Sequence, residues 1–424
     1  MLSKSVLFLQ GPLGPFFREL AREFSAHDYR THKINFNGGD RFYSGADHCV
    51  DYVGSVTDWP GFLERYLTGH GIQSVFLMGD CRLYHRMAKP VCDRLGVDFM
   101  VFEEGYLRPD TITLEKGGVN ALTALDFSRA ALAAASSQRQ QADVAMPASM
   151  KQRIVYAALY YWAAFFQRNR FDQYQHHRAF HPIIEGAKWW RGLGRKYRCK
   201  GRDGQIQNRL TGELSGRFFL VALQVHDDSQ MRYHSDYESV EAFIEEVVAS
   251  FAAYARDDET LVFKHHPMDR GYTDYQQTIE ALAEHHGVAK RVLYCHDISL
   301  PELYHHTKGV VTVNSTVGIS ALLHLLPVKV TGQAFYDIAG LTSQCSLNQF
   351  WLTPEPVHAG LFDRFYSIIF RESQINGSFF RELPLSCENA RLFYEQRFRG
   401  RRIAEIVNVA EPVQTVMDGE QAVA

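Results

Sequence analysis

The sequence predicts an α/β protein with two Rossmann-like halves that face a central cleft. Short apolar, β-rich segments alternate with helical segments in the first part of the chain, which is typical of parallel βαβ units. The same alternation starts again after a turn-rich break at residues 210–216. A chain of 424 residues is long enough for two to three domains. Two Rossmann-like halves are therefore the simplest account.

Each half is predicted from its own series of strands and helices. In the first half we expect strands at 5–10, 31–36, 74–78 and 98–102 and helices at about 16–25, 59–69 and 84–95. In the second half we expect strands at 218–224, 260–265, 291–294 and 309–313 and helices at about 240–255, 274–286, 299–306 and from about 316. Residues 356–409 read as mainly helical and are expected to pack across both halves. The expected domains are 1–215, including a helical segment at 128–205, then 216–380, then a helical tail at 381–424.

Composition excludes several classes of protein. Hydrophobic residues make up 46% of the chain and charged residues 22%, which excludes a disordered, collagenous or coiled-coil protein. The formal net charge of −3 argues against a dedicated nucleic-acid-binding protein. The seven cysteines are scattered and never spaced as CxxC, so neither a disulfide framework nor a zinc site is predicted. We expect no metal and no cofactor.

The apolar segments predict a protein of the cytoplasm, free or attached to a membrane surface. The N-terminal apolar run covers only residues 6–9, which is too short for a signal peptide. The longest nearly apolar stretch, residues 154–166, is shorter than the roughly 20 residues that a membrane-spanning helix needs.

Residues 151–205 differ in composition from the rest of the chain. This window has 12 Lys and Arg against three Asp and Glu, a net charge of +9, and it also holds 12 aromatic residues. Aromatic and basic helices suit a membrane interface with anionic headgroups. A helical insertion with aromatic residues in its core and charges on its solvated face is the alternative reading.

Two motifs follow predicted strands of the first half, where an open α/β sheet binds its ligands. In QGPLGPFF, Gly11 and Gly14 would let the backbone approach a ligand closely, although a plain Gly/Pro turn fits as well. In FEEGYLRPD, the carboxylates of Glu103 and Glu104 precede the flexible Gly105. One carboxylate could act as a general base or as a nucleophile at a sugar carbon, with Arg108 neutralising a substrate carboxylate or orienting a glutamate. An exposed acidic turn is the alternative.

Two further motifs predict a phosphate site in the second half. In VFKHHPMDRG, Lys264 and His266 would project to the same side of an extended segment, and Pro267 would fix the turn. In VTVNSTVGIS, Asn314, Ser315 and Thr316 lie between a strand and the start of a helix, where a phosphate would meet N–H groups and hydroxyls. Ser315 or Thr316 could equally be a simple N-cap. Gln224 and Ser229, after the first strand of this half, could line the same crevice.

Six segments together resemble the KpsS (LipB) family of bacterial capsule polysaccharide biosynthesis proteins. They are LQGPLGPFF, HKINFNGGD, EEGYLRP, the segment from Gln224 to Ser235, FKHHPMDRG and VNSTVGISAL, in this order, and the resemblance runs from about residue 5 to 345. The acidic pair followed by glycine and the His-Pro pair are also similar to those of CMP-sugar-dependent capsule glycosyltransferases.

The resemblance implies a GT-B fold and transfer of β-linked Kdo from CMP-β-Kdo to a lipid, (lyso)phosphatidylglycerol. It implies retention at the sugar carbon, and a product that starts the linker of a capsule chain. Family members bind the donor in the second half, which places His266 at the CMP phosphate with Ser315 and Thr316 beside it. The family element with Asp at its second position maps onto Glu103, Glu104 and Gly105, so Glu104 takes the place of the expected nucleophile.

The resemblance also implies a place at the inner-membrane surface among other capsule assembly and export proteins, and no nucleic-acid partner. With a lipid acceptor, residues 151–205 are interpreted as an interfacial element. Two other classes stay open. One is a nucleotide-sugar epimerase of GT-B fold, which has carboxylates and histidines in a similar cleft. The other is a noncatalytic scaffold of the capsule assembly and export complex.

Overall fold

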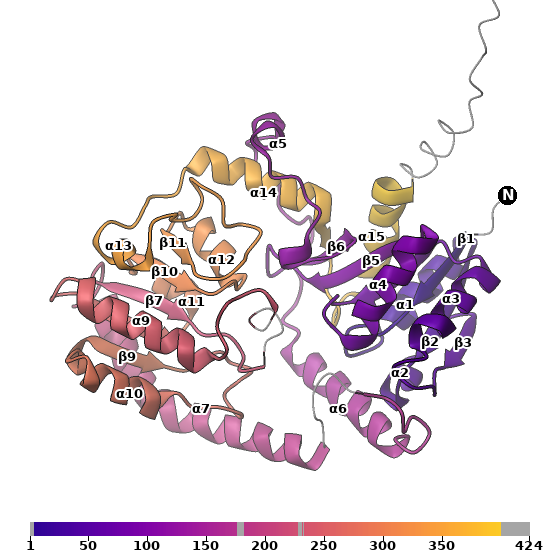
Figure 1. Ribbon diagram of the computed structural model, residues 1–424, viewed down its shortest axis with the longest axis horizontal. Coiled ribbons are helices and arrows are strands. Elements are labelled where there is room, and N and C mark those ends of the chain that lie inside the picture. The colour runs from indigo at the N-terminus through magenta and orange to yellow at the C-terminus, as the bar shows by residue number, and fades with distance from the viewer. Residues whose placement is uncertain (1–3, 176–181, 228–230, 232, 400–424) are drawn as a thin grey trace, which may run out of the picture.

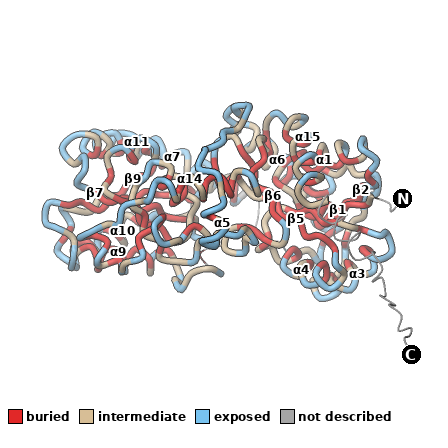
Figure 2. Tube along the Cα trace, turned by 90° about the horizontal axis from the view of Figure 1, so that it is seen from above, coloured by how far each residue is buried: buried red, intermediate tan, exposed pale blue. Residues whose placement is uncertain are grey.

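Two sheets form the frame of the molecule, one in each half (Figure 1). The computed structural model describes residues 4–175, 182–227, 231 and 233–399. Buried residues lie along both sheets (Figure 2), and they form hydrophobic clusters in each half. This arrangement confirms the predicted α/β class with two Rossmann-like halves, which is the GT-B architecture.

The first sheet has the strand order β12-β6-β5-β4-β1-β2-β3. Strands β1 to β5 are parallel, β6 runs antiparallel to β5, and the edge strand β12 runs antiparallel to β6. The strands are β1 Lys4–Phe8, β2 Tyr29–Asn35, β3 His48–Asp51, β4 Ser74–Met78, β5 Asp98–Glu104, β6 Thr111–Lys116 and β12 Gln374–Asn376. The helices between them are α1 Phe16–Ser25, α2 Gly38–Phe42, α3 Trp59–His70 and α4 Leu83–Leu95. A short 3₁₀ turn, η1, covers Asn120–Leu122.

The second sheet is parallel throughout and has the order β11-β10-β7-β8-β9. Its strands are β7 Phe218–Ala222, β8 Thr260–Lys264, β9 Val292–Cys295, β10 Gly309–Thr312 and β11 Val328–Val330. Its helices are α9 Val240–Tyr254, α10 Gln276–His285, α11 Leu300–Tyr304, α12 Val317–Leu323 and α13 Leu347–Leu352, with a 3₁₀ turn η2 at Ala289–Arg291. Strands β7, β8 and β10 are buried along their whole length, which explains their continuous apolar runs.

The predicted strands and helices of both halves are present, but four further strands were not predicted. β3 is an edge strand with the sequence HCVD and is mostly exposed, so no apolar run marks it. β6 holds the polar residues Thr111, Thr113 and Glu115, all of which are buried. β11 and β12 have only three residues each. Short or polar strands such as these are specified by their neighbours in the sheet rather than by their own sequence.

The helical segment expected at 128–205 does not pack as one unit with the first half. Its helices are α5 Arg129–Ala134, α6 Met150–Phe166 and α7 Pro182–Thr211. Helix α6 packs on α2 of the first half. Helix α7 instead covers the edge strand β9, and Ile206 and Leu210 enter the core of the second half. Helix α5 packs on α14 (Ala359–Ser373), with Leu132 in the same core. The insertion therefore bridges the two halves.

The chain returns to the first half near its end, as the expected packing across both halves requires. Helix α14 belongs to the core of the second half through Phe362 and Phe365, after which β12 pairs with β6 in the first sheet. Helix α15, Leu383–Tyr394, then packs on α1, and a π-helical turn follows at Glu395–Arg399. Residues 374–376 therefore belong to the first sheet although they fall inside the range expected for the second domain. Residues 400–424 of the expected tail lie outside the described residues.

Candidate active site between the two halves

Both sheets present the same topological switch point. The strand order reverses between β1 and β4 in the first half and between β7 and β10 in the second, and α/β folds bind ligands outside the carboxyl ends of strands at such points. Two contacts join these ends across the halves. The guanidinium of Arg86 lies 4.7 Å from the ring centre of Tyr233, and the ring centres of Tyr106 and Phe335 are 4.7 Å apart. The loops after the strands therefore meet at the junction of the halves.

The acidic pair lies at the carboxyl end of β5, two residues before the junction residue Tyr106. In the ladder with β6, Glu103 pairs with Thr113. The Glu104 N–H donates to Glu103 Oε1 at 2.9 Å. Burial raises the pKa of Glu103 to about 7, and the charges of Glu104 and Asp80 add to the rise, while the Glu104 N–H and Arg108 oppose it. A carboxyl group with a pKa near 7 suits a general acid or base at neutral pH.

Glu104 has a different environment from Glu103. Its carboxylate forms an ion pair with Arg153 of α6, at 3.1 Å between Oε1 and Nη1. The same guanidinium lies over the ring of Phe380, 5.2 Å from its centre. Arg153 is thus held against both the acidic pair and the segment that follows β12. Two adjacent carboxyl groups with unequal surroundings can take unequal roles.

The turn after the acidic pair has no space for a side chain at Gly105, and it is held by hydrogen bonds to a residue that is distant in sequence. A Cβ on Gly105 would lie 2.1 Å from the Thr111 carbonyl oxygen, so no other residue fits there. Arg108 is exposed, and its Nε donates to the Gly105 carbonyl at 3.0 Å. Gln374 Oε1 accepts from the N–H of Tyr106 at 3.0 Å and from the Thr111 hydroxyl at 2.9 Å. Nothing local in the sequence indicated Gln374, because it comes from β12, more than 260 residues later.

The QGPLGPFF loop follows β1 and contacts α6. A Cβ on Gly11 would lie 2.6 Å from the ring of Phe17, and Gly14 has φ = +134° with the ring of Tyr156 only 2.8 Å from its Cβ position. Protein side chains therefore already require both glycines, and close approach of a ligand stays a prediction. Arg82 Nη1 donates to the Gly11 carbonyl at 3.3 Å and so bridges the switch point of the first half.

Helix α6 closes this side of the first half through a buried polar network. The Tyr160 hydroxyl donates to Asp40 Oδ1 at 2.9 Å and accepts from Asn37 Nδ2 at 2.8 Å. Gln10, the first residue of the loop, donates to Asp40 Oδ2 at 3.3 Å and to the Tyr174 hydroxyl at 2.9 Å. The HKINFNGGD segment therefore serves to anchor α6 over the strand ends.

The predicted phosphate-binding residues at the end of β8 differ in how far they are buried. Lys264 is buried, His266 is partly exposed and Pro267 is exposed. Burial lowers the pKa of Lys264, and its Nζ has no hydrogen-bond or ion-pair partner among the residues that the structure describes. His265 turns into the core, where its Nδ1 lies 2.7 Å from the Tyr294 hydroxyl and burial lowers its pKa to about 4.

The structure brings Gln224 and Asn314 together across the second switch point. Gln224 Nε2 donates to Asn314 Oδ1 at 3.0 Å, and Asn314 Nδ2 donates to the His234 carbonyl at 3.1 Å. Ser315 Oγ accepts from the Val317 N–H at 3.2 Å, so this hydroxyl already bonds the backbone at the start of α12. Thr316 precedes α12 without a side-chain cap bond, and α12 has only seven residues. Ser229 lies outside the described residues.

A histidine–carboxylate pair at the same edge was not predicted. His226 Nδ1 lies 2.5 Å from Asp269 Oδ1, and Asp269 is fully buried. His226 follows β7 and Asp269 follows β8, and these strands are neighbours in the sheet. The sequence did contain a signal, since polar residues that follow adjacent parallel strands are expected to meet.

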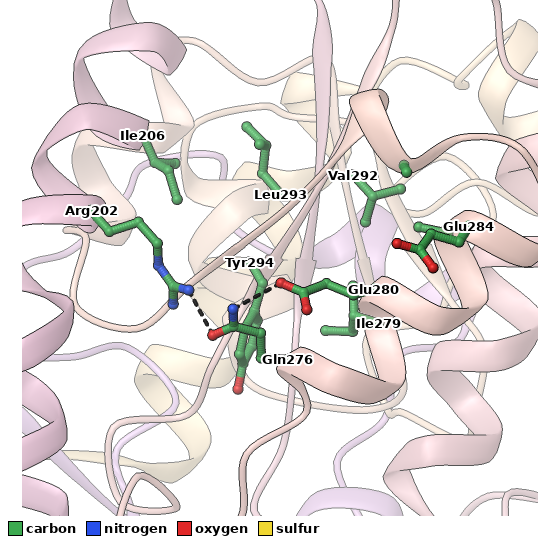
Figure 3. A pocket seen from close by; sticks show the side chains of 11 residues that line it. Arg202, Ile206, Gln276, Ile279, Glu280, Glu284, Val292, Leu293 and Tyr294 are labelled. Carbon is green, nitrogen blue, oxygen red and sulfur yellow. Dashed lines mark hydrogen bonds between the residues drawn. The ribbon is translucent and has the colours of Figure 1, made fainter.

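In the described part of the chain, no metal centre coincides with these residues. No group of three or more His, Cys, Asp or Glu there is placed to hold a metal ion. A pocket of about 370 Å³ lies between α7, α10 and β9 (Figure 3). Arg202 donates to Gln276 and Gln276 donates to Glu280 along its wall. Its lining includes none of the predicted site residues.

Comparison with known proteins gives a family model and full-length relatives. The family model described as "Capsule polysaccharide biosynthesis protein" matches residues 73–380. The chain is 40% identical to "Capsule polysaccharide export protein KpsS" of Escherichia coli over 89% of this chain and 97% of that protein. It is 38% identical to "Capsule polysaccharide modification protein LipB" of Neisseria meningitidis over 90% of this chain and 93% of that protein.

Solved structures with low sequence identity also align with most of the chain. The structure of KpsC, a beta Kdo 2,7 transferase of Thermosulfurimonas dismutans, aligns with a TM-score of 0.41 and 13% identity, covering 92% of this chain and 98% of that one.

Proposed function

Because this chain belongs to the capsule polysaccharide biosynthesis protein family, we propose that it is a glycosyltransferase that builds the lipid end of a capsule chain. In this proposal it transfers β-linked Kdo from CMP-β-Kdo to (lyso)phosphatidylglycerol. One observation carries the proposal. Glu103 and Glu104 end β5 in one half, while in the other half Lys264 ends β8 and His266 follows it, and the contact between Tyr106 and Phe335 joins the halves two residues after the acidic pair. The first set supplies carboxylates for chemistry at a sugar carbon, and the second supplies cations for a phosphate.

The unequal environments of the two glutamates support a division of labour. Glu104, which is ion-paired with Arg153, attacks the anomeric carbon of the donor, and the bond to CMP breaks with its electron pair leaving on the phosphate oxygen. The acceptor hydroxyl then attacks the same carbon, its proton passes to Glu103, and the bond to Glu104 breaks. Two inversions give net retention. The pKa of about 7 allows Glu103 to accept and release that proton near neutral pH.

Donor binding falls to the second half in this account. Lys264 and His266 contact the CMP phosphate, with Asn314, Ser315 and Thr316 beside them, and Gln224 positions Asn314. The buried Lys264 ammonium supports this role, because a buried cation that has no hydrogen-bond or ion-pair partner among the described residues gains from an anionic ligand. The proposal includes no metal ion and no cofactor.

We further propose that α6 and α7 attach the protein to the cytoplasmic side of the inner membrane. These two adjacent helices lie along one edge of the molecule (Figure 1) and carry 11 of the 21 large apolar side chains that are exposed among the described residues. Those 11 are Met150, Ile154, Val155, Leu159, Trp162, Phe166, Ile184, Trp189, Trp190, Leu193 and Tyr197. The net charge of +9 over 151–205 complements anionic lipid. In the described part of the chain, no helix is long and apolar enough to cross a membrane.

Transfer itself is the direct test. Purified protein is incubated with CMP-Kdo, generated in place, and a fluorescent phosphatidylglycerol, and the lipid product is analysed by mass spectrometry. A lipid carrying one Kdo residue is expected. A nucleotide sugar that is isomerised without an acceptor would instead indicate an epimerase. Intact donor and lipid, in the presence of other capsule proteins as well, would indicate a scaffold of the assembly and export complex.

Membrane attachment has a separate test with a matched control. Arg191, Arg198 and Lys200 of α7 are exposed, and the triple Gln variant is expected to lose binding to phosphatidylglycerol vesicles. The control replaces Arg30, Arg65 and Lys290 by Gln, which removes the same charge from exposed sites outside α6 and α7. Equal vesicle binding by both variants would contradict the proposed surface.

A further inference from the structure

The His226–Asp269 pair is placed to contact a ligand at the switch point of the second half. His226 comes two residues after Gln224, which hydrogen-bonds Asn314 across that switch point. Asp269 comes three residues after His266, and the Asp269 N–H donates to the His266 carbonyl at 3.0 Å. The pair therefore lies between the two groups of residues that were predicted to bind the donor.

The carboxylate of Asp269 is held in place by hydrogen bonds and forms an ion pair with the imidazole of His226. It is fully buried, and it accepts hydrogen bonds from the hydroxyls of Thr273 and, at 3.4 Å, Tyr275. Its ion-pair partner among the described residues is His226, at 2.5 Å. A buried carboxylate is costly unless it is paired, and a separation this short is typical of charge-assisted bonds. Asp269 therefore fixes the orientation of the imidazole.

One ring nitrogen of His226 is paired with Asp269, and the other can contact a ligand. Nδ1 faces Asp269, and the ring packs near Tyr272, with 5.2 Å between ring centres. The side chain is 35% exposed, and Nε2 has no hydrogen-bond partner within the described ranges. A histidine held by a carboxylate on one nitrogen presents the other in a defined direction, as in many binding and catalytic sites.

We propose that His226 Nε2 binds an anionic oxygen of the donor and that Asp269 is the residue that positions it. This inference rests on the proposed function, because it assigns the anion to a nucleotide-linked sugar. The buried Lys264 ammonium at the end of the same strand pair supports an anion here. The oxygen belongs either to the phosphate or to the carboxylate of the sugar, which share the chemistry that the imidazole recognises.

The test compares ligands that differ by one charged group. Affinities for cytidine, CMP and CMP-Kdo are measured for the full-length protein and for His226→Gln. Loss of one charge-assisted hydrogen bond is expected to weaken the anionic ligand roughly 10- to 100-fold and to leave cytidine unchanged. Weaker binding of CMP identifies the phosphate as the partner. Unchanged CMP with weaker CMP-Kdo identifies the sugar carboxylate.

Asp269→Asn separates positioning from direct contact. If Asp269 acts through His226, this variant loses the same ligands, and the double variant is no weaker than His226→Gln alone. His285→Gln, an exposed histidine on α10, is the matched control and is expected to bind as wild type. Thermal unfolding of each variant reports folding independently of binding.

Three results would overturn the inference: unchanged affinity for all three ligands in His226→Gln, an equal loss for cytidine, or strictly additive losses in the double variant. The proposed donor fails separately if the wild-type protein binds another nucleotide in place of CMP. The same comparison, made with that nucleotide and its nucleoside, then still decides the role of His226.

Discussion

The carboxyl end of the first sheet carries the partly buried carboxyl groups of Glu103 and Glu104, whereas the same end of the second sheet carries the buried amine of Lys264. Burial raises the pKa of Glu103 to about 7 and lowers that of Lys264. Both shifts have the same cause, since a charge is disfavoured away from water. Two halves with one strand order and one type of switch point thus differ in the residues that follow their strands. The strand order therefore determines where the site lies, and the residues that follow the strands determine which chemistry it can carry out.

The largest loss of activity is expected when the carboxylate proposed as the nucleophile is removed. Glu104→Gln is expected to lower the rate of transfer by at least about 10³-fold, since loss of a nucleophile has effects of this size or more. Affinity for CMP should not change, because nucleotide binding is proposed for the second half. The readouts are product formation and CMP titration. Glu64→Gln on α3 serves as the control for loss of a carboxylate, and full activity of Glu104→Gln would contradict the assignment.

Replacing Glu103 should change both the rate of transfer and the dependence of stability on pH. As general acid and base, it is expected to contribute about 10²- to 10⁴-fold, so Glu103→Gln should lose that much of the rate. Its pKa is raised from 4.5 to about 7, so the folded state binds this proton more tightly than the unfolded chain. The stability that the group contributes is therefore present below pH 4.5 and is lost as the pH rises through 7.

The stability of Glu103→Gln should accordingly depend on pH. At pH 8 the variant is expected to melt about 1 °C above wild type, which corresponds to roughly 1 kcal/mol in a chain of 424 residues. At pH 4.5 the two proteins should melt together. Thermal unfolding across this pH range is the measurement, and a constant difference would show that burial does not disfavour the charge.

Substitutions at the proposed phosphate site of the second half are expected to lower the affinity for the donor rather than the rate of the chemical step. His266→Ala should weaken donor binding roughly 10- to 100-fold, as expected for one hydrogen bond to a charged group. The kcat at saturating donor should change less than KM. His286→Ala removes an exposed histidine of the same half and should have no effect. A His266→Ala variant with normal KM and low kcat would place this histidine in the chemical step.

The smallest expected effect concerns the contact between α6 and the acidic pair. Arg153 and Glu104 are both partly exposed, and ion pairs of this kind contribute about 0–1 kcal/mol. Arg153→Gln should therefore lower the rate by no more than about fivefold, with no effect on CMP affinity. Arg170, which follows α6 in the chain and pairs with Asp51 at 2.7 Å, provides the control. A loss as large as that of Glu104→Gln would make Arg153 part of the catalytic machinery.

Local patterns in the sequence predicted most of the fold. The apolar runs of β1, β4, β7 and β8 and the helices after them were predicted because burial on both faces leaves a clear signal. Long-range pairing left no such signal. The return of β12 to the first sheet and the packing of α7 on β9 depend on contacts between segments that are distant in sequence. The packing of residues 182–211 on the second half could not be predicted for this reason.

In the candidate site, too, residues that meet through long-range contacts could not be predicted from local patterns. The strings around Glu103, Glu104, Lys264 and His266 were found because they directly follow predicted strands. Three partners of the site were not found. Arg153 comes from a helix that the sequence marked only as basic and aromatic, and Gln374 comes from a three-residue strand. The pairing of His226 with Asp269 needed the order of β7 and β8 in the sheet.

The most direct test of two cooperating halves is the mass of the protein after incubation with CMP-Kdo and no acceptor. The account predicts release of CMP and a covalent Kdo adduct on the peptide that contains Glu104, which disappears when phosphatidylglycerol is added. The adduct should be absent from Glu104→Gln and should form at higher donor concentration in His266→Ala. An adduct on another residue, or product formation at the wild-type rate by Glu104→Gln, would contradict it.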